Sequence, residues 1–416
     1  MSGLALENIV TARGAARTVG ALHEMGTKLF GAYRGHSIAV ISSDPLVQVA
    51  AVAAGAHLGM AVLVLPPESY GPRTQARVSE AVQVIWSEDD ETPGQGSAPD
   101  SAGLILLTSG TTGPPKLITH SYDSVDTTRG MTLDPERWIC TYTAGTYAWF
   151  QVVMLALGVP GQAIVVPDVI SGQDIYRAIA ENGVTAVPST PSFWRFLFAT
   201  VPRPELVKLP IHRVSLGGER ADQGILDALS GLYPQAKITH IFASTETGAA
   251  IVVSDGREGF PKDWLDRPIM GGKVKLKIAD DNLWIKSPYS HLGESKWIDT
   301  GDEVEIVGDR VLYRGRSGER TINVGGGKVV NSVLEDHVAS LRGILYTRAY
   351  PKTAPFVGNL VALDIVVDRM VWPDHDQAED QIRASCRDKL PDWYEPRFVR
   401  FLDEVPLGPN LKSRHV

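Results

Sequence analysis

The chain has 416 residues, of which 44% are hydrophobic and 21% are charged. This length allows two or more domains with their own cores, and the composition is ordinary for a soluble globular protein. The net charge of −8, without a lysine or arginine tract, argues against a nucleic-acid partner, because phosphate backbones select basic surfaces. The two cysteines, Cys140 and Cys386, lie outside any motif and far apart, which is typical of a reducing cytosol.

The most apolar stretch, residues 46–66, is predicted to be a buried helix that leads into a strand rather than a membrane span. Gln48 and His57 interrupt it, and Asp44 and Pro45 supply an N-cap and a first-turn residue. The N-terminus lacks a basic segment followed by an apolar core, so no secretory signal is expected. These features predict a cytoplasmic protein.

Short apolar runs alternate with helical patterns through the first three hundred residues. The runs expected to hold strands are residues 36–45 (a strand and then a helix cap), 61–67, 82–87, 161–167, 184–191 and 212–219. A helix is expected at residues 174–183, where a glycine ends it. This alternation predicts parallel sheets covered by helices on both faces. Residues 87–101 are acidic and rich in proline, glycine and serine, which predicts a surface loop.

The pattern changes near residue 270, where period-two alternation predicts antiparallel hairpins. One hairpin is expected around Asp280-Asp281-Asn282 and the next around Gly308-Asp309. A polar segment after Arg316 is interpreted as a hinge. We therefore expect an α/β protein in which residues 1–316 form mainly parallel sheets covered by helices, plus a small β-barrel-like part. Residues 317–416 would form a small, mobile α+β domain.

Residues 104–116, LILLTSGTTGPPK, carry the strongest chemical signal. An apolar run, typical of a buried strand, stops at a loop rich in hydroxyls and glycines that ends in Lys116. Backbone N–H groups, four hydroxyls and one cation in such a loop can surround a polyphosphate. Gly110 and Gly113 let the backbone approach a ligand closely, and the two prolines stiffen the exit. The loop does not fit the P-loop pattern GxxxxGK[ST], and the alternative is an ordinary Ser/Thr/Gly turn.

Several later segments offer groups that suit a nucleotide. Residues 216–219, LGGE, end a strand and are expected to open a helix, and their glycines let a flat ligand lie against the backbone. Residues 242–246, FASTE, offer an aromatic face, hydroxyls and a carboxylate suited to Mg²⁺. Asp302 lies at a turn that suits a ribose diol, Arg316 supplies a guanidinium, and Lys412 is a cation near the C-terminus. Each segment alone is equally compatible with a turn, a cap or a surface ion pair.

In their order and joint presence, these motifs resemble those of the acyl-adenylating (AMP-binding) superfamily of acyl-CoA synthetases, aryl-acid ligases and peptide-synthetase adenylation domains. The resemblance runs from about residue 36 to the end. It implies that one loop grips the pyrophosphate of ATP through Thr108, Ser109, Gly110, Thr111, Thr112, Gly113 and Lys116. It implies that the adenine lies among Gly217, Gly218, Glu219, Phe242 (in place of the usual tyrosine) and Ala243.

The same resemblance implies the remaining roles. Thr245 would touch the α-phosphate and Glu246 would hold Mg²⁺, while Asp302 and Arg316 would bind the ribose. Lys412 would bridge the acid carboxylate and the α-phosphate, and Gly325 and Gly326 would meet pantetheine in a second conformation. The implied chemistry is formation of an acyl adenylate and pyrophosphate, followed by transfer to a thiol of CoA or of an acyl carrier protein. Charge neutralisation and alignment suffice for such a step, without a general base.

The chain departs from the family pattern in a few places. Leu117 follows the loop lysine where a glycine is usual, and the hinge acid is either replaced by Gly318 or shifted to Glu319. The signature loop begins early and the segment between Glu246 and Asp302 is short. Because every motif that contacts ATP is retained, we interpret the chain as a compact active enzyme. The alternative is an ATP-binding protein without turnover.

The acid pocket is expected at residues 141–151 and 189–194. The resemblance implies that an enzyme of this family that activates an amino acid carries an aspartate in the first segment, to pair with the α-ammonium group. No acidic residue lies between Arg137 and Asp168, which argues against an α-amino acid as substrate. The aromatic residues in these segments favour an aromatic or small apolar acid, although each could equally pack the core. The candidate contacts are Tyr147, Trp149, Ser189 and Ser244. An amine or another small nucleophile remains an alternative acceptor, and the histidines show no metal-ligand spacing.

Overall fold

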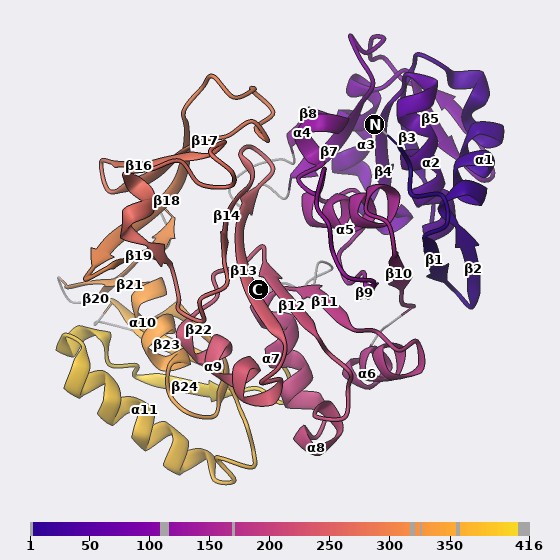
Figure 1. Ribbon diagram of the computed structural model, residues 1–416. Helices are drawn as coiled ribbons and strands as arrows, with labels where there is room; N and C mark the ends of the chain where they lie inside the picture. The colour runs from indigo at the N-terminus through magenta and orange to yellow at the C-terminus, as the bar shows by residue number, and fades with distance from the viewer. Residues whose placement is uncertain are drawn as a thin grey trace.

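The computed structural model describes residues 3–108, 116–168, 171–316, 321–324, 327–354 and 358–406. Two large, mainly parallel sheets come first along the chain, and a five-stranded antiparallel sheet and a C-terminal α+β unit follow (Figure 1). In this view the first sheet lies at the upper right in indigo, and the last two parts lie on the left in orange and yellow. The predicted α/β class is therefore confirmed.

The first large sheet has six strands in the order β6-β5-β3-β4-β7-β8. Its strands are β3 (Ser37–Ile41), β4 (Ala61–Leu65), β5 (Val84–Ser87), β6 (Glu91–Pro93), β7 (Gly103–Thr108) and β8 (Lys116–Ser121). The inner strands run parallel, and β6 and β8 close the two edges in antiparallel pairing. The short strand β6 lies inside residues 87–101, which the sequence predicted to be a surface loop. The predicted phosphate loop falls between β7 and the edge strand β8 in the sequence, and its residues 109–115 lie outside the described residues.

The helices of this part are α1 (Val19–Phe30), α2 (Pro45–Leu58), α3 (Pro72–Ala81) and the short α4 (Tyr122–Val125). Helix α2 begins as predicted, because the Asp44 carboxylate accepts a hydrogen bond from Leu46 N and Pro45 occupies the first turn. It ends at Gly59, whose φ is +68°. The helix is apolar around its whole circumference and almost entirely buried, which explains its resemblance to a membrane segment.

The second large sheet has eight strands in the order β14-β13-β12-β11-β9-β10-β1-β2. Its strands are β1 (Ile9–Ala12), β2 (Ala15–Thr18), β9 (Glu136–Ile139), β10 (Gln162–Val166), β11 (Ala186–Ser189), β12 (Arg213–Gly217), β13 (Lys237–Ser244) and β14 (Gly248–Val253). The six central strands are parallel, and the edge strands β2 and β14 are antiparallel to their neighbours. The associated helices are α5 (Tyr147–Gly158), α6 (Gly172–Glu181), α7 (Pro191–Thr200), α8 (Arg203–Leu206) and α9 (Gln223–Leu232).

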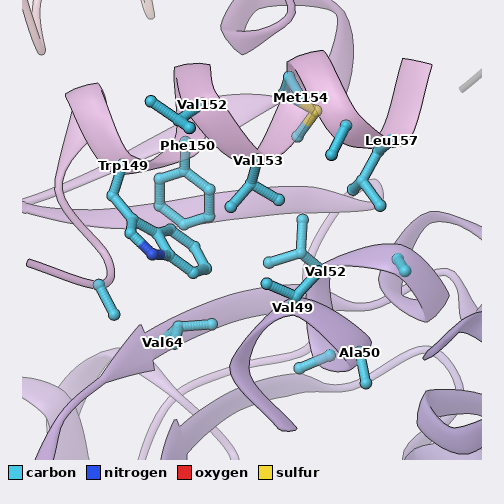
Figure 2. Packing of buried hydrophobic residues seen from close by; sticks show 14 of the residues in the cluster. Val49, Ala50, Val52, Val64, Trp149, Phe150, Val152, Val153, Met154 and Leu157 are labelled. Atoms are coloured by element: carbon cyan, nitrogen blue, oxygen red, sulfur yellow. The ribbon is translucent and has the colours of Figure 1, made fainter. Parts of the chain in front are cut away.

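The two sheets share one core, and α1, α2 and α5 lie between them. Figure 2 shows this layer, in which side chains of α5 face the valines of α2 and Val64 of β4. Helix α3 covers the far face of the six-stranded sheet, and α6, α7 and α9 cover the far face of the eight-stranded sheet. The result is five alternating layers of helix and sheet, as expected for parallel sheets whose strands are apolar on both faces.

The five-stranded sheet has the order β15-β19-β18-β17-β16 and is antiparallel throughout. Its strands are β15 (Phe260–Pro261), β16 (Lys275–Ala279), β17 (Asn282–Lys286), β18 (Ile298–Val307) and β19 (Arg310–Arg316). Both predicted hairpins are present. Asp280 and Asp281 form the first turn with φ values of 51° and 60°, whereas Asn282 already belongs to the strand and pairs with Ala279.

The C-terminal unit has its own hydrophobic core. Its elements are β20 (Thr321–Val324), β21 (Gly327–Val330), α10 (Asn331–Ala339), β22 (Ile344–Ala354), β23 (Gly358–Val367), α11 (His375–Lys389) and β24 (Phe398–Phe401). Strands β22, β23 and β24 form a sheet, and Asp374 is the N-cap of α11, where its side chain accepts a hydrogen bond from Asp376 N. Across the described ranges, none of the helices combines the length and apolar character that a bilayer crossing demands.

Candidate functional site

Four neighbouring parallel strands, β9, β11, β12 and β13, end at the same edge of the eight-stranded sheet. Ser189 at the end of β11 pairs with Leu216, and Gly217 at the end of β12 pairs with Ile241. The carboxyl ends of parallel strands are the usual place for ligands in such sheets. The predicted residues 189, 217–219 and 242–246 are therefore brought together, although more than fifty residues separate the first from the last.

The connection that follows β12 holds the predicted adenine glycines. Gly218 has a φ of +78°, a conformation that favours glycine. The Glu219 carboxylate turns back toward α7, where its Oε2 accepts a hydrogen bond of 3.0 Å from Ser192 N. Helix α9 begins only at Gln223, with Asp222 as its N-cap, so the expectation that LGGE opens a helix is wrong. A short turn at Gly218 and Glu219 remains between strand and helix.

Phe242 lies where the eight-stranded sheet meets the antiparallel sheet. Its ring stacks on Tyr313 of β19, with centroids 5.2 Å apart and planes at 5°. The Tyr313 hydroxyl is buried and has no hydrogen-bond partner among the described residues, and burial raises its pKa, helped by the nearby Asp302 carboxylate. Asp302 pairs in register with Arg316 across β18 and β19. The predicted adenine and ribose contacts therefore come from adjoining sheets.

Residues 245–247 form the tight turn that connects β13 to β14. The Ser244 hydroxyl accepts a hydrogen bond of 3.1 Å from Thr247 N and lies 3.0 Å from the Thr247 hydroxyl. Gly248 follows with a φ of +74°, and a Cβ there would come within 2.5 Å of Tyr289 Cβ. The turn that carries Thr245 and Glu246 is therefore tightly constrained. The Ser244 hydroxyl, which was predicted to contact the acid, is instead hydrogen-bonded within this turn.

Two histidines that the sequence did not single out hold this turn from outside. His120 Nε2 lies 2.6 Å from the carbonyl oxygen of Thr245, and His291 Nδ1 lies 3.0 Å from that of Glu246. His120 is on β8, just beyond the phosphate loop, and His291 follows β17. Local spacing carries no signal for these contacts, because His120 and Thr245 are 125 positions apart.

The residues predicted to contact the acid differ in their burial and in their hydrogen bonds. Tyr147 begins α5, and its Oη accepts a hydrogen bond of 2.9 Å from Ala249 N. Trp149 is 1% exposed and belongs to the core between the sheets, as Figure 2 shows. Ser189 is buried, and its hydroxyl has no partner within the described ranges. Of these groups, the Ser189 hydroxyl is the one that the described part of the protein leaves unsatisfied.

The surroundings of Glu246 bear on its predicted role as a ligand of Mg²⁺. Within the described ranges, no cluster of three or more histidine, cysteine or acidic side chains could hold a metal ion. Mg²⁺ commonly takes one or two carboxylates and fills its other positions with phosphate oxygens and water. A single half-buried carboxylate on a rigid turn fits that pattern and does not fit a metal held entirely by protein.

Other predicted residues are described partly or not at all. Lys116 begins β8 and is exposed, and the backbones of Thr108 and Arg316 end β7 and β19. The predicted residues that lie outside the described residues are Ser109, Gly110, Thr111, Thr112, Gly113, Gly325, Gly326 and Lys412.

Both cysteines are buried and free. Burial raises the pKa of Cys140 to about 12 and that of Cys386 to about 11, so neither thiol provides a thiolate near neutral pH. Both cysteines therefore lie in surroundings typical of structural cysteines.

Comparison with protein families gives one direct match. A family model described as "AMP-binding enzyme" matches residues 69–284. This range contains the strand before the phosphate loop, the turn after β12 and the turn that carries Thr245 and Glu246.

Individual curated proteins are similar to this chain at modest sequence identity. A dimodular nonribosomal peptide synthase of Bacillus subtilis (strain 168) is 24% identical over 362 residues, which cover 75% of this chain and 14% of that protein. Three further curated relatives are matched over 10%, 64% and 53% of their length, so the chain spans less than two thirds of each of these proteins.

Solved structures share the fold over nearly the whole chain. The anthranilate CoA ligase AuaEII, in complex with anthranoyl-AMP, superposes with a TM-score of 0.76 at 15% identity, covering 99% of this chain and 93% of that one. The amide bond synthetase McbA from Marinactinospora thermotolerans gives a TM-score of 0.70 at 18% identity, covering 98% and 95%.

Proposed function

Since the chain belongs to the family of AMP-binding enzymes, we propose that it activates a carboxylic acid with ATP and passes the acyl group to a thiol. In the first step a carboxylate oxygen bonds to the α-phosphorus of ATP, the bond from that phosphorus to the β-phosphate oxygen breaks, and pyrophosphate leaves. In the second step the sulfur bonds to the carbonyl carbon, the bond to AMP breaks, and the thiol proton passes to solvent.

One observation carries this proposal. The glycine turn after β12, the ring of Phe242 and the turn with Thr245 and Glu246 lie at neighbouring strand ends, with Asp302 on the adjoining sheet. This order offers, side by side, a flat backbone surface for a base, an aromatic ring, a carboxylate for a ribose and a carboxylate beside the phosphates. A simple turn or helix cap does not require these groups to be near each other.

We assign the individual roles as follows. Gly217, Gly218, Glu219, Phe242 and Ala243 hold the adenine, with one face of the Phe242 ring already covered by Tyr313. The ribose is bound by Asp302 and Arg316. The loop from Thr108 to Lys116 holds the departing pyrophosphate, and Thr245 meets the α-phosphate.

The charge that develops on the phosphates needs cations rather than a base. Lys116 and Lys412 supply positive charge from the protein, and Glu246 would hold Mg²⁺. When bound, this ion neutralises phosphate charge and favours the departure of pyrophosphate. Lys412 also aligns the acid carboxylate with the α-phosphate.

We place the boundary of the mobile domain after Arg316, so that residues 1–316 bind ATP and acid and residues 317–416 alternate between two positions. In the second position Gly325 and Gly326 would admit a pantetheine thiol of CoA or of a carrier protein. The similarity to a nonribosomal peptide synthase supports a carrier, whereas the fold shared with a CoA ligase supports CoA.

For the acid we propose an aromatic or small apolar compound. Ser189 offers the best-placed polar contact, because its hydroxyl lies at the strand ends and has no described partner. The hydroxyls of Tyr147 and Ser244 are already engaged within the protein, and Trp149 belongs to the core. The fold shared with a ligase of an aromatic acid is compatible with this class.

A second candidate function keeps the adenylate but delivers it to an amine. The fold shared with an amide bond synthetase makes this route equally compatible with the scaffold. Both routes share the first step and differ only in the nucleophile that the second conformation admits.

Measuring acid-dependent pyrophosphate release with Mg·ATP tests the proposal. The panel should contain benzoic, cinnamic, short and long fatty acids and amino acids, each alone, with CoA, and with a simple amine. We expect release with an aromatic or small apolar acid and stimulation by CoA. Stimulation by the amine alone would establish the second candidate, and ATP binding without release for any acid would favour a protein without turnover.

A further inference from the structure

Two histidines from separate parts of the chain hold consecutive carbonyl groups of the turn that carries Thr245 and Glu246. His120 Nε2 is 2.6 Å from Thr245 O and His291 Nδ1 is 3.0 Å from Glu246 O, and the backbone N–H of His291 donates to the same Glu246 oxygen at 3.3 Å. The two rings lie 6.1 Å apart. Both therefore act on one three-residue turn.

The direction of these hydrogen bonds follows from the chemistry of the partners. A carbonyl oxygen only accepts, so the ring nitrogen that faces it carries the proton. In neutral His120 the proton is then on Nε2, and the Nδ1 lone pair accepts from the Ser124 hydroxyl at 3.0 Å. His120 is 1% exposed, and its ring also lies beside that of Tyr147 at 6.1 Å. Its orientation is therefore fixed from several sides.

These bonds constrain the backbone on both sides of one residue. The Thr245 carbonyl belongs to the peptide plane before Glu246, and the Glu246 carbonyl belongs to the plane after it. Peptide planes are rigid, so holding both oxygens restricts the two backbone dihedral angles at Glu246 and with them the direction of its Cα–Cβ bond. The neighbouring Thr245 side chain is constrained through the same plane.

We propose that His120 and His291 are positioning residues that aim Glu246 and Thr245 at the metal ion and the α-phosphate of ATP. This inference rests on the proposed function of the same site. His120 also connects two parts of that site, because its strand β8 starts at Lys116, directly after the phosphate loop.

Paired substitutions separate positioning from stability. His120→Leu removes the donor, whereas His120→Gln keeps an N–H donor of similar reach. His291→Leu removes one of two donors to the Glu246 oxygen, so its effect should be smaller. His240→Leu is the matched control, because His240 is also buried and its Nε2 also faces a main-chain carbonyl, that of Arg257 at 3.0 Å, away from the turn.

Three readouts apply to the full chain: the Mg²⁺ concentration for half-maximal pyrophosphate release, the Mg²⁺ dependence of ATP binding by calorimetry, and amide hydrogen exchange at residues 245–247 without ligands. For His120→Leu we expect the half-maximal Mg²⁺ concentration to rise about tenfold, as when partners that orient a metal ligand are removed. Exchange at the turn should become faster. His120→Gln should recover most of the loss, and His240→Leu should lower only thermal stability.

An unchanged Mg²⁺ dependence in His120→Leu, with only thermal stability lost as in His240→Leu, would overturn the inference. If the wild-type protein releases no pyrophosphate with any acid, the proposed function is wrong, but the inference about the histidines can still be tested. The test is then the Mg²⁺ dependence of ATP binding, measured by calorimetry. The inference would be contradicted if the affinity of the wild type for ATP did not depend on Mg²⁺. It would also be contradicted if the ATP affinity of His120→Leu depended on Mg²⁺ in the same way as that of the wild type.

Discussion

Gly218 shows how a single residue shapes the site. Its φ of +78° turns the chain sharply after β12 and leaves the backbone open where a base is proposed to lie. For a residue with a Cβ, this left-handed conformation costs about 1–2 kcal/mol. Gly217 differs, since it has no positive φ and an added Cβ would come no closer than 3.7 Å to Ile241 O.

Gly218→Ala is therefore expected to destabilise the protein by about 1–2 kcal/mol, whereas Gly217→Ala should change stability by less than about 0.5 kcal/mol. Urea unfolding of both variants, followed by tryptophan fluorescence, measures the difference. Equal destabilisation of the two variants would show that the left-handed backbone at Gly218 is not the cause.

At the level of elements, the β13–β14 hairpin depends on a buried, neutral histidine. Burial lowers the pKa of His120 from its ordinary value of 6.5, and the nearby His291 acts in the same direction, while Thr245 O and Glu246 act in the opposite one. The unfolded chain therefore binds more protons than the folded chain below pH 6.5. This contribution to stability is full above pH 6.5 and is lost as the pH falls through the lowered pKa.

We expect the thermal stability of the wild type to decline as the pH falls below 6.5, and that of His120→Gln to decline less, because this variant lacks the titrating group and keeps a donor. Calorimetric melting at several pH values measures both slopes. His36→Gln is the control, because His36 is only partly buried and its ring contacts a carbonyl of its own loop. A steeper decline in His120→Gln than in the wild type would contradict this explanation.

On the scale of the whole molecule, one residue connects the proposed adenine turn to the C-terminal unit. Arg220 follows Glu219 and forms ion pairs with Asp336 on α10 and, at 3.3 Å, with Glu258. Side chains of β22 and β23 also pack near Phe196 and Phe198 of α7. The position of the C-terminal unit is thus tied to the turn on which the nucleotide is proposed to lie.

Several elements of the fold were predicted correctly from the sequence. Residue types and periodicity predicted the parallel sheets, the helix cap at Asp44 and both hairpins. Those signals are local, because a cap, a turn or an alternating strand is encoded within about ten residues. The same locality predicted that a strand ends within residues 216–219, and β12 does end at Gly217.

Long-range packing was not predictable in this way. The residues near Phe242 in the sequence do not indicate that its ring stacks on Tyr313, which belongs to another sheet. The residues near His120 likewise do not indicate that its ring contacts the carbonyl oxygen of Thr245. Trp149 illustrates the opposite difficulty, because an aromatic residue beside a predicted pocket and one in the core have the same local pattern. Contacts between distant segments decide such cases, and they appear only once the sheets are assembled.

Acid-dependent exchange of labelled pyrophosphate into ATP tests the central claim most directly, because it requires reversible formation of an acyl adenylate. The acid that is active in pyrophosphate release should be used, with the wild type and with Lys412→Ala. The account predicts exchange in the wild type only when acid is present, and its loss in Lys412→Ala with ATP binding nearly intact. Exchange without acid, or undiminished exchange in Lys412→Ala, would contradict it.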